Sequence, residues 1–192
     1  MFLVADQEML LAQTIFVCSI ILISSFVYIF MSTPQKQSFF QVWVIGPNGA
    51  ILEPVLAISS NQSYLISVGV QNTMRHIEYC RLTTKFQSAP LSNVSTTSVE
   101  LEDFRFFLLD NETWARNISF EIDSTAEDAM IRIHGIKLDG SYFMFNLTSA
   151  FDSDLNGFFW QFRFDLWAFN TSSFDFYSTN IWASSPFLNM TQ

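Results

Sequence analysis

Two hydrophobic patterns divide the chain near residue 39. Residues 9–31 are apolar and carry no charge, whereas in many segments after residue 39 apolar and polar positions alternate with a period of two. The first pattern predicts a long apolar helix, and the second predicts β-strands that each turn one face inward. We therefore expect an N-terminal tail and helix over 1–31, a polar linker over 32–38 and a β domain over 39–192.

The 23 uncharged residues of 9–31 form about 34 Å of helix at about 1.5 Å per residue, and the hydrocarbon core of a bilayer is about 30 Å thick. The segment follows acidic residues and ends without a small-residue cleavage site, which argues against a secretory signal peptide. We therefore predict a retained transmembrane anchor in contact with membrane lipid.

Thr14, Cys18 and Ser25 fall on one face of this predicted helix. Small side chains let two helices approach closely in lipid, so these three residues are candidate helix-packing positions. A lone anchor that tolerates small polar residues explains them equally well, and the sequence leaves both interpretations open.

The alternating segments predict short strands with defined inner and outer faces. Within 116–122, Ile118 and Phe120 are expected to point inward and Asn117 outward. Asp139-Gly140 is a hairpin signal between two strands. About eight or nine such strands, regular turn signals and no soluble helix period predict an antiparallel β-sandwich.

Aromatic residues are abundant, and the 22 phenylalanines are expected to form most of the core. Packing is also the stronger expectation for Trp160, Trp167 and Trp182, with a sugar-binding platform as the alternative.

Composition and motifs exclude several functions. The net charge of −9 argues against nucleic acid as a partner, because phosphate binding needs clustered Lys and Arg. His76 and His134 have no metal-ligand spacing around them, and no nucleotide or nucleophile motif is present. Residues 152–157 imitate the start of a calcium loop, but Arg163 stands where its bidentate carboxylate is needed. We therefore expect no enzyme activity, no cofactor and no metal.

Asparagine in the Asn-x-Ser/Thr pattern is over-represented. Seven of the 11 asparagines fit it, whereas the frequency of Ser and Thr predicts about two. N-linked glycans require exposed sites outside the cytoplasm. Lys36 alone favours the opposite orientation by the positive-inside rule, and we expect the N-terminus inside and the β domain outside the cell membrane. The predicted glycosylation sites are Asn61, Asn93, Asn111, Asn117, Asn146, Asn170 and Asn189.

The stretch FFQVWVIGPNGAILEPVLAISSNQSYLISVGVQN is similar to an archaeal membrane-associated Ig-like domain family of unknown function. The shared marks are a strand that runs into Ile-Gly-Pro, a later Pro, and a strand that ends in Val-x-Asn, with LLDNETWARNISF and FDLWAFN further along. The resemblance covers roughly 39–192 and implies an Ig-like sandwich and a place at the cell surface.

Two functions fit these observations. The first is an accessory or structural subunit of an archaeal membrane or cell-envelope assembly, N-glycosylated and acting through contacts with other proteins. The alternative is a pilin-like subunit of a glycosylated extracellular filament. A pilin needs a short basic leader before its helix, and no Lys or Arg precedes residue 36, so we favour the first.

Overall fold

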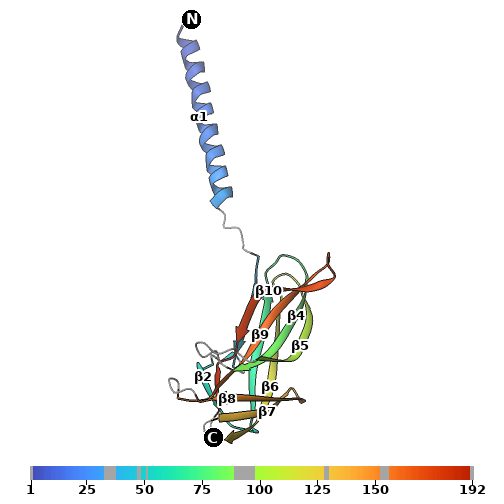
Figure 1. Cartoon of the computed structure of the whole chain (residues 1–192). Helices are drawn as coiled ribbons and strands as arrows, with labels where there is room; N and C mark the ends of the chain where they lie inside the picture. Colours follow the sequence, from blue (N-terminus) through green and yellow to red (C-terminus); the bar gives the residue numbers. More distant parts are fainter. Residues whose placement is uncertain are drawn as a thin grey trace. The chain divides into compact units, whose positions relative to one another are not determined.

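The computed structural model describes residues 2–32, 38–46, 49–50, 52–88, 98–127, 130–151 and 156–190 (Figure 1). The chain forms two compact units, residues 1–37 and residues 38–192. The first contains the helix α1 (Phe2–Ser32), and the second contains all the described strands.

The described part of α1 is apolar and exposed. Side chains are described from residue 13 to residue 28, and all of them are exposed. Hydroxyl groups along it bond to the preceding turn, since the Ser19 hydroxyl donates to the carbonyl of Ile15 and the Ser25 hydroxyl to that of Ile21. These local bonds satisfy the serine hydroxyls without a partner helix.

The predicted transmembrane anchor over 9–31 is wrong. Within the described part of the chain, no helix has the combined length and apolar character that a membrane crossing requires. The single-pass placement, with the N-terminus inside and the β domain outside, depended on that span and is corrected with it.

The first sheet of the β unit has five strands in the order β1-β3-β6-β7-β8, and every neighbouring pair is antiparallel. The β7–β8 hairpin turns at Asp139 and Gly140, both at positive φ, as the Asp-Gly signal predicts. The strands are β1 (Phe40–Ile45), β3 (Ser63–Asn72), β6 (Thr113–Glu127), β7 (Met130–Leu138) and β8 (Ser141–Ala150).

The second sheet has six strands in the order β2-β11-β9-β4-β5, with β10 also paired to β9. Its pairs are antiparallel except β11 with β2, which run parallel. The strands are β2 (Val55–Ile58), β4 (Glu78–Ser88), β5 (Ser98–Leu108), β9 (Phe159–Asn170), β10 (Asp175–Ser184) and β11 (Phe187–Met190).

The core lies between the two sheets, and alternation along the strands builds it. Ile118 and Phe120 on β6 are buried, whereas Asn117, which directly precedes Ile118, is exposed, as predicted. Phe162 and Phe164 on β9 are fully buried, and Phe120 meets Phe162 edge-on at 4.9 Å. The expectation of a β-sandwich is therefore confirmed, but its strands are not all antiparallel as expected, because β2 and β11 pair in parallel.

Candidate functional site

The outward side of β5, β4, β9 and β10 carries aromatic and charged side chains, and we call it the outer face. Leu82 on β4 and Phe164 on β9 point into the core, so alternate residues of these strands point away from it. Paired residues on neighbouring strands point to the same side of a sheet, so the outer face is arranged in cross-strand rows.

The first row is aromatic and lies at the end of the sheet where β4 begins. Tyr79 pairs with Phe107 on β5, and their rings stack with centres 4.5 Å apart. On the other side of Tyr79, the ring centres of Phe169 and Phe176 lie 5.8 and 5.3 Å away. Phe107 is 68% exposed. Large aromatic side chains left exposed on a rigid sheet are typical anchors of protein contacts.

The second row is cationic. Arg81 pairs with Arg105 on one side and with Trp167 on the other. The Arg81 guanidinium lies 5.0 Å from the centre of the Trp167 ring and 4.9 Å from that of Phe176, and the Arg105 guanidinium lies 5.9 Å from that of Phe176. Aromatic faces attract guanidinium groups. The rings therefore hold two positive charges side by side on the surface.

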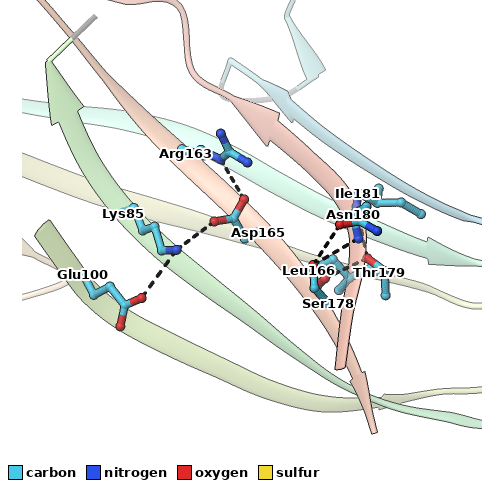
Figure 2. A network of polar contacts seen from close by, with 9 residues as sticks. All are labelled: Lys85, Glu100, Arg163, Asp165, Leu166, Ser178, Thr179, Asn180 and Ile181. Atoms are coloured by element: carbon cyan, nitrogen blue, oxygen red, sulfur yellow. Dashed lines mark hydrogen bonds and ion pairs between the residues drawn. The ribbon is translucent and has the colours of Figure 1, made fainter. Parts of the chain in front are cut away.

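Beyond the arginines the outer face carries an ionic network (Figure 2). Lys85 on β4 lies between Asp165 on β9, with Nζ and Oδ2 3.1 Å apart, and Glu100 on β5, at 3.5 Å. Arg163 Nε donates to Asp165 Oδ1 at 2.7 Å, and its guanidinium lies 4.6 Å from the ring centre of Trp182. Trp182 is 53% exposed, so this end of the outer face also presents an aromatic side chain.

The charge of the outer face differs from that of the chain. Four of the nine basic residues lie on it beside three acidic ones, whereas the whole chain has 18 acidic residues. The outer face therefore carries a net charge of about +1 within a chain of net charge −9. Its charged residues are Arg81, Lys85, Arg105, Arg163, Glu100, Asp103 and Asp165.

A hollow of about 690 Å³ adjoins the aromatic row where β4 begins. At its wall, Nε2 of His76 lies 2.6 Å from Oε1 of the buried Glu78 carboxyl. Burial raises the pKa of Tyr177, and the nearby Glu78 and Cys80 raise it further. The lining residues are His76, Ile77, Glu78, Tyr79, Phe107, Phe169, Asn170, Thr171 and Tyr177.

Five of the predicted glycosylation sites are exposed, and four of them lie in turns or on the first sheet, whereas Asn170 lines the hollow beside the aromatic row. Asn61 and Asn111 occupy turns at positive φ, and Asn170 closes β9. Asn117 and Asn146 lie on β6 and β8 of the first sheet, where the Ser67 hydroxyl donates to Asn117 Oδ1. Turns and open strand positions are accessible to an attached sugar.

The two remaining predicted glycosylation sites are Asn93 and Asn189. Asn93 lies outside the described residues. Asn189 on β11 is half-buried, and its Oδ1 accepts a hydrogen bond from the backbone N–H of Phe158 at 3.2 Å. Its side-chain amide lies so close to Gly157 that a Cβ there would overlap it. The carboxamide of Asn189 is therefore enclosed.

The candidate helix-packing residues Thr14, Cys18 and Ser25 are exposed on α1, and the structure describes no partner helix for them. Asp152 and Asp154 of the calcium-like loop lie outside the described residues. Among the residues that are described, no group of three or more His, Cys, Asp or Glu side chains is placed to hold a metal ion.

The expectation that Trp160, Trp167 and Trp182 pack in the core is correct for one of the three. Trp160 is fully buried in the core, as packing predicts, whereas Trp167 and Trp182 lie on the outer face under arginine side chains. The pairing of Arg81 with Arg105 was not predicted. A signal was available, because the outward positions of 77–86 and 160–169 hold Tyr, Arg and Trp in place of small polar residues.

No protein-family model matches the chain, and no curated protein matches it. Among solved structures, the chain is similar to the CARDB domain of a Pyrococcus furiosus protein that was crystallised with di-metal ions. The TM-score is 0.37 and the identity 9%, over 81% of this chain and 90% of that one.

Two further similar structures are larger proteins. A β-glucosidase from Erythrobacter marinus matches with a TM-score of 0.39 and 11% identity over 80% of this chain, which spans 16% of the glucosidase. The sporulation control protein Spo0M from Bacillus subtilis matches with a TM-score of 0.36 and 11% identity over 80% of this chain, which spans 49% of Spo0M. These are distant likenesses, and they carry no functional information.

Proposed function

We propose that the chain is a glycosylated accessory or structural subunit of a cell-envelope assembly, that it is not an enzyme, and that it binds other proteins through the outer face. The observation that carries the proposal is the outer face itself, where Phe107 is exposed beside the row of Arg81 and Arg105, and Trp182 is exposed beside Arg163. Aromatic and arginine side chains are the residues most enriched at the energetic centres of protein interfaces.

The positions of Asn61, Asn111, Asn117 and Asn146 support this choice, whereas a sugar on Asn170 would lie beside the aromatic row. In the described part of the chain, exposed sequon asparagines lie on the first sheet, in turns and at the end of β9. A sugar on a protein surface blocks the approach of a partner, so an interface needs a surface without one. The resemblance to the archaeal Ig-like family is the ground for placing the assembly in an archaeal cell envelope.

The test is purification of the tagged full chain from native material with its associated proteins. Replacing Phe107 or Trp182 with Ser is expected to lower the yield of the associated proteins at least about tenfold, since loss of an interface anchor costs about 2 kcal/mol or more. The matched control is Met144→Ser, which removes an 84% exposed side chain from the first sheet and is expected to change nothing. Equal yields from all three variants would contradict the proposal.

A filament subunit is the second candidate, and α1 is the observation that favours it. Ten large apolar side chains between Ile15 and Tyr28 are exposed, on all sides of the helix. A helix that is apolar all round is normally buried. In a fibre, copies of α1 would enclose one another, with Thr14, Cys18 and Ser25 at the closest approach. Recovery of the chain in sheared extracellular fibres would support this candidate, and a chain that never pellets with fibres would exclude it.

A further inference from the structure

β5 is an edge strand of the second sheet. It ends the strand order β2-β11-β9-β4-β5, and in the described part of the sheet its only partner is β4. An edge strand presents a row of free backbone N–H and C=O groups that can pair with another strand. At 11 residues, β5 is also longer than a typical strand of about five or six residues.

Arg105 on this edge is placed unfavourably within a single chain. It lies directly opposite Arg81 on β4, and like charges directly opposite each other destabilise a sheet. The ion pairs among the described residues include none for Arg105, whereas Arg81 Nη1 lies 4.0 Å from Asp103 Oδ2. Arg105 is exposed and therefore available to a carboxylate from outside the chain.

The sequence around Phe104 is self-complementary in charge. Asp103 and Arg105 flank Phe104 and point to the same side of the sheet, because residues two apart on a strand share a face. When two copies of β5 pair antiparallel about a two-fold axis at Phe104, residue 103 of one copy stands opposite residue 105 of the other. The Asp103 carboxylate then meets the Arg105 guanidinium twice, once on each side of the axis.

We propose that β5 is a self-association surface whose partner is the β5 strand of a second copy of this chain, aligned by reciprocal Asp103–Arg105 ion pairs. The inference rests on the proposed function, since it names one protein partner of the chain. Neighbouring registers are less favourable: moving the axis to residue 105 would place two arginines opposite each other, and this cost selects the register.

The β-bulge between Thr83 and Lys85 limits the length of the pairing. Two β5 residues, Leu101 and Glu102, stand opposite the single residue Thr84 there, so the regular part of the edge begins at Asp103. With the axis at Phe104, residues 106 and 107 of one copy stand opposite residues 102 and 101 of the other, so the regular pairing between copies covers residues 103–105. Bulges near an edge restrict pairing and prevent open-ended growth. The expected product is a weak, closed two-fold dimer and not a fibre of β-sheets.

The experiment is a charge exchange in the full chain. Asp103→Arg places arginines at both 103 and 105, and Arg105→Asp places aspartates at both, so each single variant repels its own copy. Self-association, measured by sedimentation over a range of concentrations, is expected to weaken at least about tenfold in each, because like-charge contacts at an interface cost several kcal/mol.

Two samples make the test independent of folding. A one-to-one mixture of the two single variants is expected to form a heterodimer as tight as the wild-type dimer, because each contact again joins Arg to Asp. The double exchange Asp103→Arg with Arg105→Asp is expected to self-associate again. An unfolded variant cannot show this rescue, so the rescue proves that both chains fold.

Three results would overturn the inference. The first is a wild-type chain that stays monomeric over a 100-fold range of concentration in sedimentation, and the second is single variants that associate as tightly as the wild type. The third is no rescue in either the mixture or the double exchange. If the chain associated through α1, the strength of association would be the same in all samples, so the single variants would associate as tightly as the wild type. None of these results affects binding of other proteins at Phe107 and Trp182, so the failure of this inference can be told from failure of the proposed function.

Discussion

Asn72 joins three segments at the end of the β unit where β3 ends. Its Nδ2 lies 2.8 Å from the carbonyl oxygen of His76 and 3.0 and 3.2 Å from those of Leu108 and Leu109. Its Oδ1 accepts the N–H of Met74 at 2.8 Å. The side chain is fully buried, so these bonds are shielded from water. The Asn of the Val-x-Asn mark is therefore a structural link between the β3–β4 and β5–β6 turns.

Replacing Asn72 with Ala is expected to lower the free energy of unfolding by about 3 kcal/mol, because buried carbonyl groups lose their donor and each costs about 1–3 kcal/mol. Urea unfolding of the full chain measures the change. Gln71→Ala, at the half-buried neighbouring position, is the control and is expected to change it by less than about 1 kcal/mol. Equal effects of the two substitutions would contradict the account of Asn72.

The two cysteines are expected to differ in reactivity. Burial raises the pKa of the Cys80 thiol to about 12, and the Glu78 carboxylate contributes to the rise. The thiolate is the reactive form, so the folded chain protects Cys80 at pH 8, whereas Cys18 is exposed on α1. Alkylation at pH 8 followed by mass spectrometry should label Cys18 alone, and Cys80 only in urea. Labelling of Cys80 at the rate of Cys18 in the folded chain would contradict its burial.

The same pKa shift predicts a pH dependence. Because the Cys80 pKa is higher in the folded chain than its usual 9.0, folding favours the neutral thiol. This contribution to stability is complete below pH 9 and is lost as the pH rises from about 9 towards about 12. Thermal unfolding midpoints of the wild type and Cys80→Ala should converge over that interval. A constant difference between them would exclude this effect.

The sequence predicted residues whose position follows from the alternation of apolar and polar side chains, and it missed residues whose contacts depend on how the strands pair. Asn117 was placed outward because its neighbours Ile118 and Phe120 are apolar, and the structure agrees. The contact of Arg81 with Arg105 depends on the register of β4 against β5, which a single sequence does not contain. The enclosed state of Asn189 likewise depends on Gly157, which is 32 positions away.

At the scale of elements, β1 and β3 are joined by a fit between an indole ring and a glycine. Gly69 pairs with Trp43, and a Cβ at residue 69 would overlap the Trp43 ring. Glycine inside a strand marks a site where another group approaches closely. The register of β1 is therefore set by this contact as well as by its backbone bonds.

Gly69→Ala is expected to lower the free energy of unfolding by about 1–3 kcal/mol, because overpacking displaces the indole. The double variant Gly69→Ala with Trp43→Leu should recover part of that loss, since the smaller side chain leaves room for the added methyl group. Chemical denaturation of the wild type, the single variants Gly69→Ala and Trp43→Leu, and the double variant gives the coupling free energy between the two residues. A coupling of zero would show that residues 43 and 69 do not meet as described.

The strands, the hairpin and the helix were largely predictable from the sequence, whereas the pairing of the strands and the function of the helix were less so. The strand over 116–122 and the Asp139-Gly140 hairpin follow from local pattern and turn chemistry. The parallel pairing of β2 with β11 joins residues more than 100 positions apart and has no local signal. The apolar run over 9–31 correctly predicted a helix, α1, but its assignment as a membrane span was wrong.

For the whole molecule, side-chain exposure distinguishes the predicted glycosylation sites from one another. Asn61, Asn111, Asn117, Asn146 and Asn170 are exposed, whereas Asn189 is half-buried with its carboxamide enclosed. Glycopeptide mass spectrometry of native material should find sugar at most of the five and none at Asn189, because attachment requires an open side chain. An intact mass equal to the 22.1 kDa polypeptide would exclude glycosylation altogether.

The central claim is that the outer face binds other proteins, and hydroxyl-radical footprinting of the full chain, free and in its native assembly, tests it most directly. Phe107 and Trp182 report on the outer face, and Met144 and Tyr142, which are 84% and 50% exposed, report on the first sheet. The account predicts that assembly protects Phe107 and Trp182 from oxidation several-fold and leaves Met144 and Tyr142 as reactive as in the free chain. Protection of Met144 and Tyr142 with Phe107 and Trp182 unchanged would contradict it.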